Sequence, residues 1–178
     1  MEIAEGTARE VIFQLRADQL DIAFIAGAPD LPDCHTRRIW HEPLLAVLST
    51  EHRLAQDDGV TWDDLAGEAF LVRLGGTGPQ AYDLIIQRMA GRWLDAPLIL
   101  RCGVERCTLF QMVAQGMGVS IAGQSAALVD MPGVVFRPFR DEPEPFPFSA
   151  VWSPYNQSAS LRNLLDLARE LGRSEPRK

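Results

Sequence analysis

The stretch that decides the fold is Met112-Val113-Ala114-Gln115-Gly116-Met117-Gly118-Val119-Ser120-Ile121. Apolar residues at helical spacing end at Gly116, and Gly118 comes directly before an apolar run over 119–122. Glycine readily adopts the left-handed conformations that stop a helix and turn the chain sharply. The stretch therefore predicts a helix over 105–116 that leads into a buried strand.

The same alternation of helical and extended patterns continues on both sides of this stretch. Thr7 and Glu10 have the spacing of a capping box, which predicts that a helix begins there. Further helices are expected over 80–93 and 158–173, with shorter ones over 61–65 and 123–129. Apolar runs predict strands over 20–25, 44–49, 69–74, 98–100, 119–122, 134–139 and 146–153. This order indicates an α/β fold with a mostly parallel sheet and right-handed crossovers.

Two breaks in the pattern indicate that the chain forms two lobes. Leu74-Gly75-Gly76-Thr77-Gly78-Pro79 is the strongest local break, and a proline-rich segment follows near 143–147. We place the boundaries there, so that lobe I comprises residues 1–73 and 150–178 and lobe II comprises residues 74–149. Two crossover segments between two lobes predict a hinge and a cleft.

Composition limits the class of protein. The 178 residues include 17 Lys and Arg against 24 Asp and Glu, so the net charge is −7, and 47% of residues are hydrophobic. We expect a globular protein with a real core and no transmembrane segment, since the apolar runs are far shorter than the ~20 residues that a spanning helix needs. The acidic start lacks the features of a secretory signal, which favours the cytoplasm. The negative charge also makes this chain alone a poor DNA binder.

Motifs for catalysis, metals and nucleotides are missing. The glycine run 75–78 lacks the Gly-Lys-Ser/Thr of a nucleotide-binding loop, and the cysteines and histidines lack zinc-ligand spacing. We therefore expect no metal, no cofactor and no catalytic residues. Arg73 is either a cation facing the cleft or an ordinary exposed arginine. Arg106 and Cys107, at the start of a helix, could face a bound carboxylate, although free cysteine is more often a small core residue.

Four stretches carry a family resemblance: 15–24, 51–55, 60–70 and 112–121. In this order and spacing the chain resembles the effector-binding domain of LysR-type transcriptional regulators. The resemblance implies two Rossmann-like lobes with the type 2 periplasmic-binding-protein fold, which sense a small metabolite between them. It also implies a homodimer that reads DNA only through a winged helix-turn-helix domain, which is absent from this chain, and it implies no enzymatic activity and no membrane partner.

By motif position, the resemblance implies ten effector-binding residues. They are Gly27, Ala28, Val72, Arg73, Leu74, Arg106, Cys107, Ala122, Gly123 and Phe148. The two arginines favour a small organic anion, and Phe148 would suit an aromatic one.

Several alternatives stay open. The family's first strand and helix have no counterpart here, so the chain is a fragment, or residues before Met1 are unrecorded, or the lobe closes in another way. A stand-alone solute-binding protein and a small enzyme on the same fold are the competing functions. A transport receptor needs an export signal or lipid anchor, and an enzyme needs convergent titratable groups in the cleft.

Overall fold

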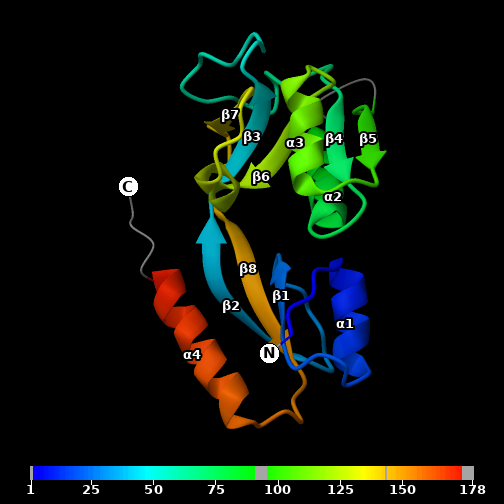
Figure 1. Ribbon diagram of the computed structural model, residues 1–178, viewed down its shortest axis with the longest axis vertical. Helices are drawn as coiled ribbons and strands as arrows, with labels where there is room; N and C mark the ends of the chain where they lie inside the picture. The colour runs from blue at the N-terminus through cyan, green and yellow to red at the C-terminus, as the bar shows by residue number, and fades with distance from the viewer. Residues whose placement is uncertain (1, 91–95, 143, 174–178) are drawn as a thin grey trace. The chain divides into compact units, whose positions relative to one another are not determined.

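The computed structural model describes residues 2–90, 96–142 and 144–173, and the chain forms two compact units (Figure 1). Unit 1 is built from residues 1–42 and 146–178, and unit 2 from residues 43–145. The elements of unit 1 are α1 (Ala8–Arg16), β1 (Ala23–Ala26), β2 (His35–Glu42), β8 (Phe146–Trp152) and α4 (Ala159–Arg173). Those of unit 2 are β3 (Leu44–Ser49), β4 (Phe70–Arg73), α2 (Gly78–Met89), β5 (Ile99–Cys102), α3 (Arg106–Ala114), β6 (Ser120–Gly123), the 3₁₀ turn η1 (Gln124–Leu128) and β7 (Val134–Pro138).

Unit 1 is an antiparallel sheet between two helices. Its strand order is β1-β8-β2, with β8 antiparallel to both neighbours. Successive side chains of a strand point to opposite faces. Accordingly Val151 packs with Leu15 of α1, whereas Trp152 packs with Leu161 of α4. The sheet is therefore covered by α1 on one face and by α4 on the other.

The beginning of α1 confirms the predicted capping box. The amide of Thr7 donates to Glu10 Oε2 at 2.7 Å, and the amide of Glu10 donates to Thr7 Oγ1 at 3.3 Å. These bonds satisfy two amides that would otherwise lack a partner at the helix start. They also lower the pKa of Glu10, because the Thr7 backbone and hydroxyl both donate to the carboxylate.

Unit 2 brings three parallel strand ends to one edge. Strands β4 and β5 are parallel, with Arg73 opposite Cys102. A parallel bridge between Phe70 and Val119 and a bond from Ser120 Oγ to the Leu71 carbonyl, at 2.8 Å, link β4 to β6. Strand β6 then continues through the antiparallel order β6-β3-β7. The carboxyl ends of β5, β4 and β6 therefore lie along the same edge.

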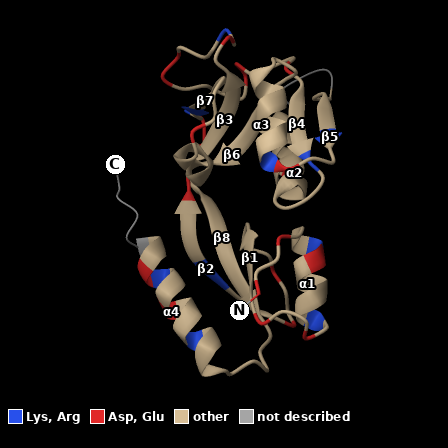
Figure 2. Ribbon diagram, in the orientation of Figure 1, with Lys and Arg blue, Asp and Glu red and all other residues tan. Residues whose placement is uncertain are grey.

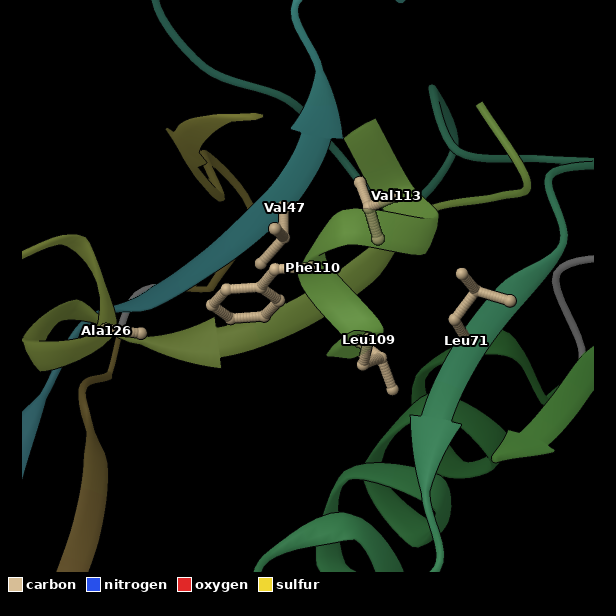
Figure 3. Packing of buried hydrophobic residues seen from close by; sticks show 6 residues of the cluster. All are labelled: Val47, Leu71, Leu109, Phe110, Val113 and Ala126. Carbon is tan, nitrogen blue, oxygen red and sulfur yellow. The ribbon is translucent and has the colours of Figure 1, made fainter. Parts of the chain in front are cut away.

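The core of unit 2 lies between α3 and this sheet. Figure 3 shows its buried side chains, which come from β3, β4, α3 and η1: Val47, Leu71, Leu109, Phe110, Val113 and Ala126. After α3, Gly116 has φ +73° and Gly118 has φ +152°. A Cβ on Gly118 would lie 2.3 Å from the Ala69 carbonyl oxygen, so only glycine fits there. The predicted stop of a helix before a buried strand is confirmed.

Three details of the predicted fold are wrong. The sequence predicted a mostly parallel sheet, but the sheets of the described residues are mainly antiparallel. Parallel neighbouring strands need a crossover connection, and among these residues only the segments that contain α2 and α3 provide one. Strand β2 was missed, since its first four residues are all exposed and form no apolar run. Residues 61–65 form turns rather than a helix, although Thr61 and Asp64 exchange the capping-box bonds.

The division into units also differs from the predicted lobes. The chain passes between units at 42/43 and 145/146, whereas the sequence suggested 73/74 and 149/150. The glycine run 75–78 is a tight turn between β4 and α2 inside unit 2, so glycine content alone did not mark a linker. The predicted helix over 80–93 corresponds to α2, and its last part, at 91–93, lies outside the described residues.

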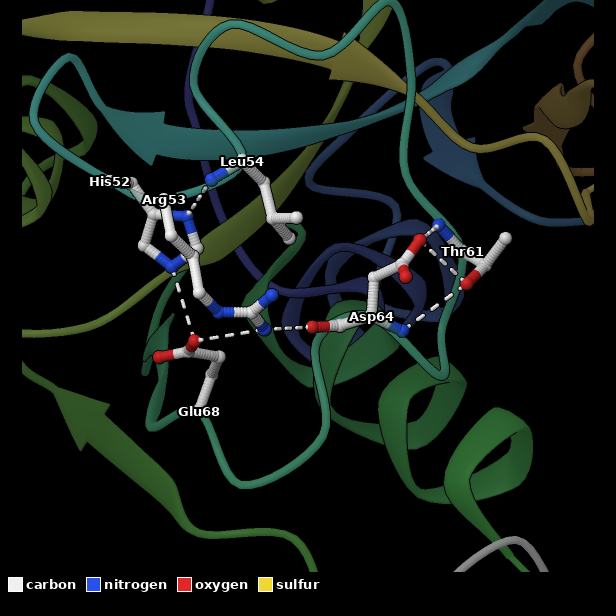
Figure 4. A network of polar contacts seen from close by, with 6 residues as sticks. All are labelled: His52, Arg53, Leu54, Thr61, Asp64 and Glu68. Atoms are coloured by element: carbon white, nitrogen blue, oxygen red, sulfur yellow. Dashed lines mark hydrogen bonds and ion pairs between the residues drawn. The ribbon is translucent and has the colours of Figure 1, made fainter.

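A polar network holds the loop between β3 and β4 (Figure 4). His52 Nε2 lies 3.1 Å from Glu68 Oε1, and the amide of Leu54 donates to His52 Nδ1 at 3.2 Å. Arg53 adds bonds to Glu68 and to the Asp64 carbonyl. Since both ring nitrogens of His52 hold the loop, this histidine has a structural role.

Candidate functional site

The candidate site is the edge of unit 2 where β4, β5 and β6 end. In open sheets with parallel strands, ligands bind outside the carboxyl ends of the strands. Arg73 is the last residue of β4, and its side chain is only 11% exposed. The edge therefore carries a largely buried cation at the place where this class of fold binds ligands.

A tight turn fixes the chain beyond Arg73. The amide of Leu74 donates to the Cys102 carbonyl at 2.9 Å, and the amide of Gly78 donates to the Gly75 carbonyl at 3.0 Å. A Cβ on Gly78 would lie 1.9 Å from the Arg73 carbonyl oxygen, so the start of α2 can approach β4 only with glycine there. The backbone around Arg73 is thus tightly constrained.

The guanidinium of Arg73 reaches the start of α3. Its Nε donates to the Val104 carbonyl at 3.2 Å, and its Nη2 donates to Glu105 Oε2 at 2.6 Å. Glu105 is the N-cap residue of α3, but its side chain makes no capping bond and is 80% exposed. The Glu105 side chain, which is mostly exposed to solvent, therefore occupies one of the hydrogen-bond donors of the Arg73 guanidinium.

Seven of the ten predicted effector-binding residues lie in unit 2 at this edge. Val72, Arg73 and Leu74 lie at the end of β4, Arg106 and Cys107 begin α3, and Ala122 and Gly123 end β6. Val72 is buried, Ala122 and Gly123 are half-buried, and Leu74, Arg106 and Cys107 are exposed. The structure brings these three segments to one edge, whereas a role in binding stays a prediction for each residue.

The other three predicted residues lie in unit 1. Gly27 and Ala28 follow β1, and Gly27 has φ +100°, donates to the Pro147 carbonyl and accepts from Ser149 Oγ at 2.7 Å. Phe148 of β8 stacks on Trp40, with ring centroids 5.0 Å apart and planes 5° apart. The backbone bonds and the aromatic stack give both segments a structural role within unit 1. Contact of one ligand with residues of both units stays a prediction.

Sequence reasoning missed Glu105, which forms an ion pair with Arg73. The two residues are 32 positions apart, so no local spacing relates them. The one available signal was an acidic residue at the start of a predicted helix, where negative charge is favourable. That signal explains its position but does not predict the ion pair.

The described residues offer no other obvious chemical centre. They contain no group of three or more His, Cys, Asp or Glu side chains placed to hold a metal ion. In the same ranges, His52 is the histidine that meets a carboxylate, and its bonds belong to the loop network. No helix in the described part of the chain is long and apolar enough to span a membrane.

These observations define an α/β ligand-binding fold of two units, with a buried arginine at the carboxyl ends of parallel strands. The family model described as the LysR substrate binding domain matches residues 1–173. The chain therefore belongs to the LysR substrate-binding domain family, which confirms the resemblance that the sequence motifs indicated. Its fold is that of the type 2 periplasmic-binding proteins.

Two curated relatives of this chain are transcriptional regulators. The uncharacterized HTH-type transcriptional regulator YnfL of Escherichia coli is 29% identical over 164 residues, which cover 92% of this chain and 55% of YnfL. The HTH-type transcriptional regulator TtuA of Agrobacterium vitis is 26% identical over 171 residues, which cover 93% of this chain and 56% of TtuA. This chain thus spans about half the length of the curated relatives that it matches.

Solved structures of regulators share the fold. The BenM effector-binding domain with its effector benzoate has a TM-score of 0.78 and 20% identity, over 96% of this chain and 79% of that one. The reduced OxyR regulatory domain from Pseudomonas aeruginosa has a TM-score of 0.75 and 22% identity, over 97% of this chain and 80% of that one. At these identities the likeness establishes the fold alone.

Proposed function

We propose that this chain is the effector-sensing part of a transcriptional regulator, and that it binds a small organic anion through Arg73. The observation that carries the proposal is the Arg73 side chain, which is 11% exposed and lies at the carboxyl ends of three parallel strands. An arginine fork matches a carboxylate with two parallel hydrogen bonds. Strand ends are also the place where α/β sheets bind ligands.

The sensing step would follow from differential binding. A ligand shifts the population of two arrangements only by as much as its affinity for them differs. Exchange of Glu105 for a ligand carboxylate on Arg73 would change the charge at the start of α3, which is one such difference. We propose that this change is passed to a DNA-reading domain outside this chain, in a cytoplasmic homodimer that itself performs no catalysis.

Calorimetric titration with benzoate tests the binding proposal, since benzoate is the effector named for BenM. Arg73→Gln should weaken binding at least about tenfold, because a hydrogen bond to a charged group contributes ~1.5–3 kcal/mol. Arg140→Gln, an exposed arginine of the same unit, is the matched control and should change little. Equal losses in both variants would contradict a specific site at Arg73.

Analysis of the recovered ligand separates sensing from catalysis. A sensor returns benzoate unchanged after long incubation, whereas an enzyme would convert it. Sedimentation of the purified chain tests the proposed homodimer, because the dimer fraction rises with concentration. If benzoate fails to bind, related carboxylates should be screened with the same two variants, and the absence of any Arg73-dependent binder would refute the proposal.

A further inference from the structure

A second group of arginines lies in unit 1, whereas Arg73 belongs to unit 2. An open hollow of about 470 Å³ is lined by Arg37, Arg38 and Ile39 of β2 and by Arg169 of α4. Figure 2 shows the positive charges in blue on β2 and along α4. All four lining residues belong to unit 1, so the hollow is complete within one unit.

Close packing of α4 on β2 forms one wall of the hollow. A Cβ on Gly172 would lie 2.6 Å from the Ile39 carbonyl oxygen and 3.1 Å from Trp40 Cβ. The last turn of α4 therefore approaches the backbone of β2 as closely as glycine allows. Arg169 precedes Gly172 by three residues and so lies on the same side of the helix. This packing brings Arg169 to the hollow that residues of β2 also line.

An aromatic ring contacts Arg37 beside the hollow. The guanidinium carbon of Arg37 lies 5.4 Å from the ring centre of Trp152, which is a favourable cation–π distance. Trp152 is only 9% exposed and packs with Leu161 of α4, so its position is fixed. Arg37 is thereby held beside the hollow, where the loss of side-chain freedom on binding would be small.

Arg37, Arg38 and Arg169 form no ion pair with a carboxylate of residues 2–90, 96–142 and 144–173. Other arginines of the chain do have such partners, as Arg16 has Asp33 and Arg88 has Glu142. The chain has an excess of acids, with a net charge of −7. Arginines that line one hollow and form no ion pair attract an anion to it.

We propose that the hollow binds a small anion that carries phosphoryl groups. Guanidinium groups recognise phosphate oxygens in a bidentate manner, and the arginines that line the hollow suit an anion with more than one charge. A volume of about 470 Å³ suits a small ligand, since ligand pockets range over ~300–1,000 Å³. Ile39 lines the hollow but is only 9% exposed, so the arginines carry the recognition and the ligand is either inorganic pyrophosphate or the phosphate monoester of a small organic molecule.

Titration calorimetry with pyrophosphate and with phenyl phosphate, in ~20 mM NaCl without divalent cations, tests this proposal. Arg38→Gln and Arg169→Gln should each weaken binding of the preferred ligand about fivefold or more. Arg162→Gln removes the same charge from the same helix but not from the hollow, and it should leave binding unchanged within about twofold. Circular dichroism and melting curves show whether each variant is folded.

Amide NMR shifts give an independent readout of position. The expected shifts on addition of ligand concentrate at residues 37–39 and 168–170. Tighter binding of phenyl phosphate would identify a phosphate monoester, and tighter binding of pyrophosphate the inorganic ion. Both outcomes support the proposal when Arg169→Gln weakens them.

Several results would overturn it. They include an equal loss in Arg162→Gln, shifts that map elsewhere, tighter binding of the tricarboxylate citrate, and no binding of either phosphoryl compound at millimolar concentration. Tighter, Arg169-dependent binding of a short DNA duplex would also overturn it, because the patch would then serve a nucleic-acid backbone. Since Arg73 takes no part, failure here leaves the proposed effector site intact, and Arg73→Gln should not change phosphate binding.

Discussion

The ion pair between Arg73 and Glu105 predicts that Glu105→Gln strengthens anion binding. This prediction rests on the proposed function, in which a ligand carboxylate binds the Arg73 guanidinium. Glu105 Oε2 already accepts from Nη2 at 2.6 Å, so the ligand must displace an internal carboxylate. Glutamine has nearly the same size but no charge, and it competes less. Arg73 stays oriented in the variant, because Nε also donates to the Val104 carbonyl.

The size of the expected gain in anion affinity depends on how exposed Arg73 and Glu105 are to solvent. Arg73 is 11% exposed but Glu105 is 80% exposed, so solvent screens the pair strongly. Such pairs contribute ~0.2–1 kcal/mol. If the ligand must break the whole ion pair, removing a pair of ~1 kcal/mol corresponds to about fivefold tighter binding in Glu105→Gln. Stability should change little, since the Glu105 side chain makes no capping bond to α3.

Calorimetric titration of benzoate into the wild type and the variant measures this difference. Glu51→Gln removes an exposed acid elsewhere in unit 2 and controls for net charge. Raising the salt concentration should reduce the advantage of Glu105→Gln, because the interaction that it removes is screened. Unchanged or weaker binding in Glu105→Gln would refute the idea that Glu105 competes with the ligand. An equal gain in affinity in Glu51→Gln would show that the gain comes from the change in net charge and not from the loss of the ion pair.

Three further predictions concern packing, thiols and acid. Gly172→Ala should lower the urea midpoint of unfolding. The added methyl group clashes with the Ile39 carbonyl at a cost of ~1–3 kcal/mol, whereas the higher helix propensity of alanine regains only ~1 kcal/mol. An unchanged midpoint would contradict the close approach of α4 to β2. Iodoacetamide labelling followed by mass spectrometry should modify exposed Cys107 before Cys34, since burial raises the pKa of the Cys34 thiol; the reverse order would contradict it. The Thr61 hydroxyl and amide donate to the Asp64 carboxylate and lower the pKa of Asp64 in the folded state. The ionised carboxylate therefore stabilises the fold above the unfolded pKa of ~4, and this stabilisation is lost as pH falls through the folded pKa. Asp64→Asn should flatten this acid dependence of stability in urea melts, and identical profiles for variant and wild type would refute the prediction.

The parts of the fold that depend on neighbouring residues were predictable. The capping box at Thr7 and the helix stop at Gly116 both depend on a few consecutive residues, and both are present in the structure. The strands that end at the candidate site were also found, since β4 and β6 are short apolar runs beside turn residues. The family resemblance supplied the ten effector residues, and seven of them lie on the edge of unit 2 where these strands end.

The parts that depend on distant residues were not predictable. Strand β2 has a first half that is fully exposed, and pairing with β8, more than 100 positions away, keeps it extended. The ion pair of Arg73 joins positions 32 apart. The cluster of Arg37 and Arg169 likewise needs the close packing of α4 on β2 that Gly172 permits. Sequence patterns located the backbone of the site, but the charges that act there depend on tertiary contacts.

The two arginine sites differ in a way that allows a bound anion to be assigned without a further structure. Arg73 is mostly buried, and salt screens buried charges much less than exposed ones. Arg37, Arg38 and Arg169 are all exposed, so binding in the hollow should weaken steeply as salt rises. Added salt also weakens the internal competition from Glu105, which partly offsets screening at Arg73. Binding at Arg73 should therefore show a shallow salt dependence and binding in the hollow a steep one, and Arg73→Gln or Arg169→Gln should each remove one of the two.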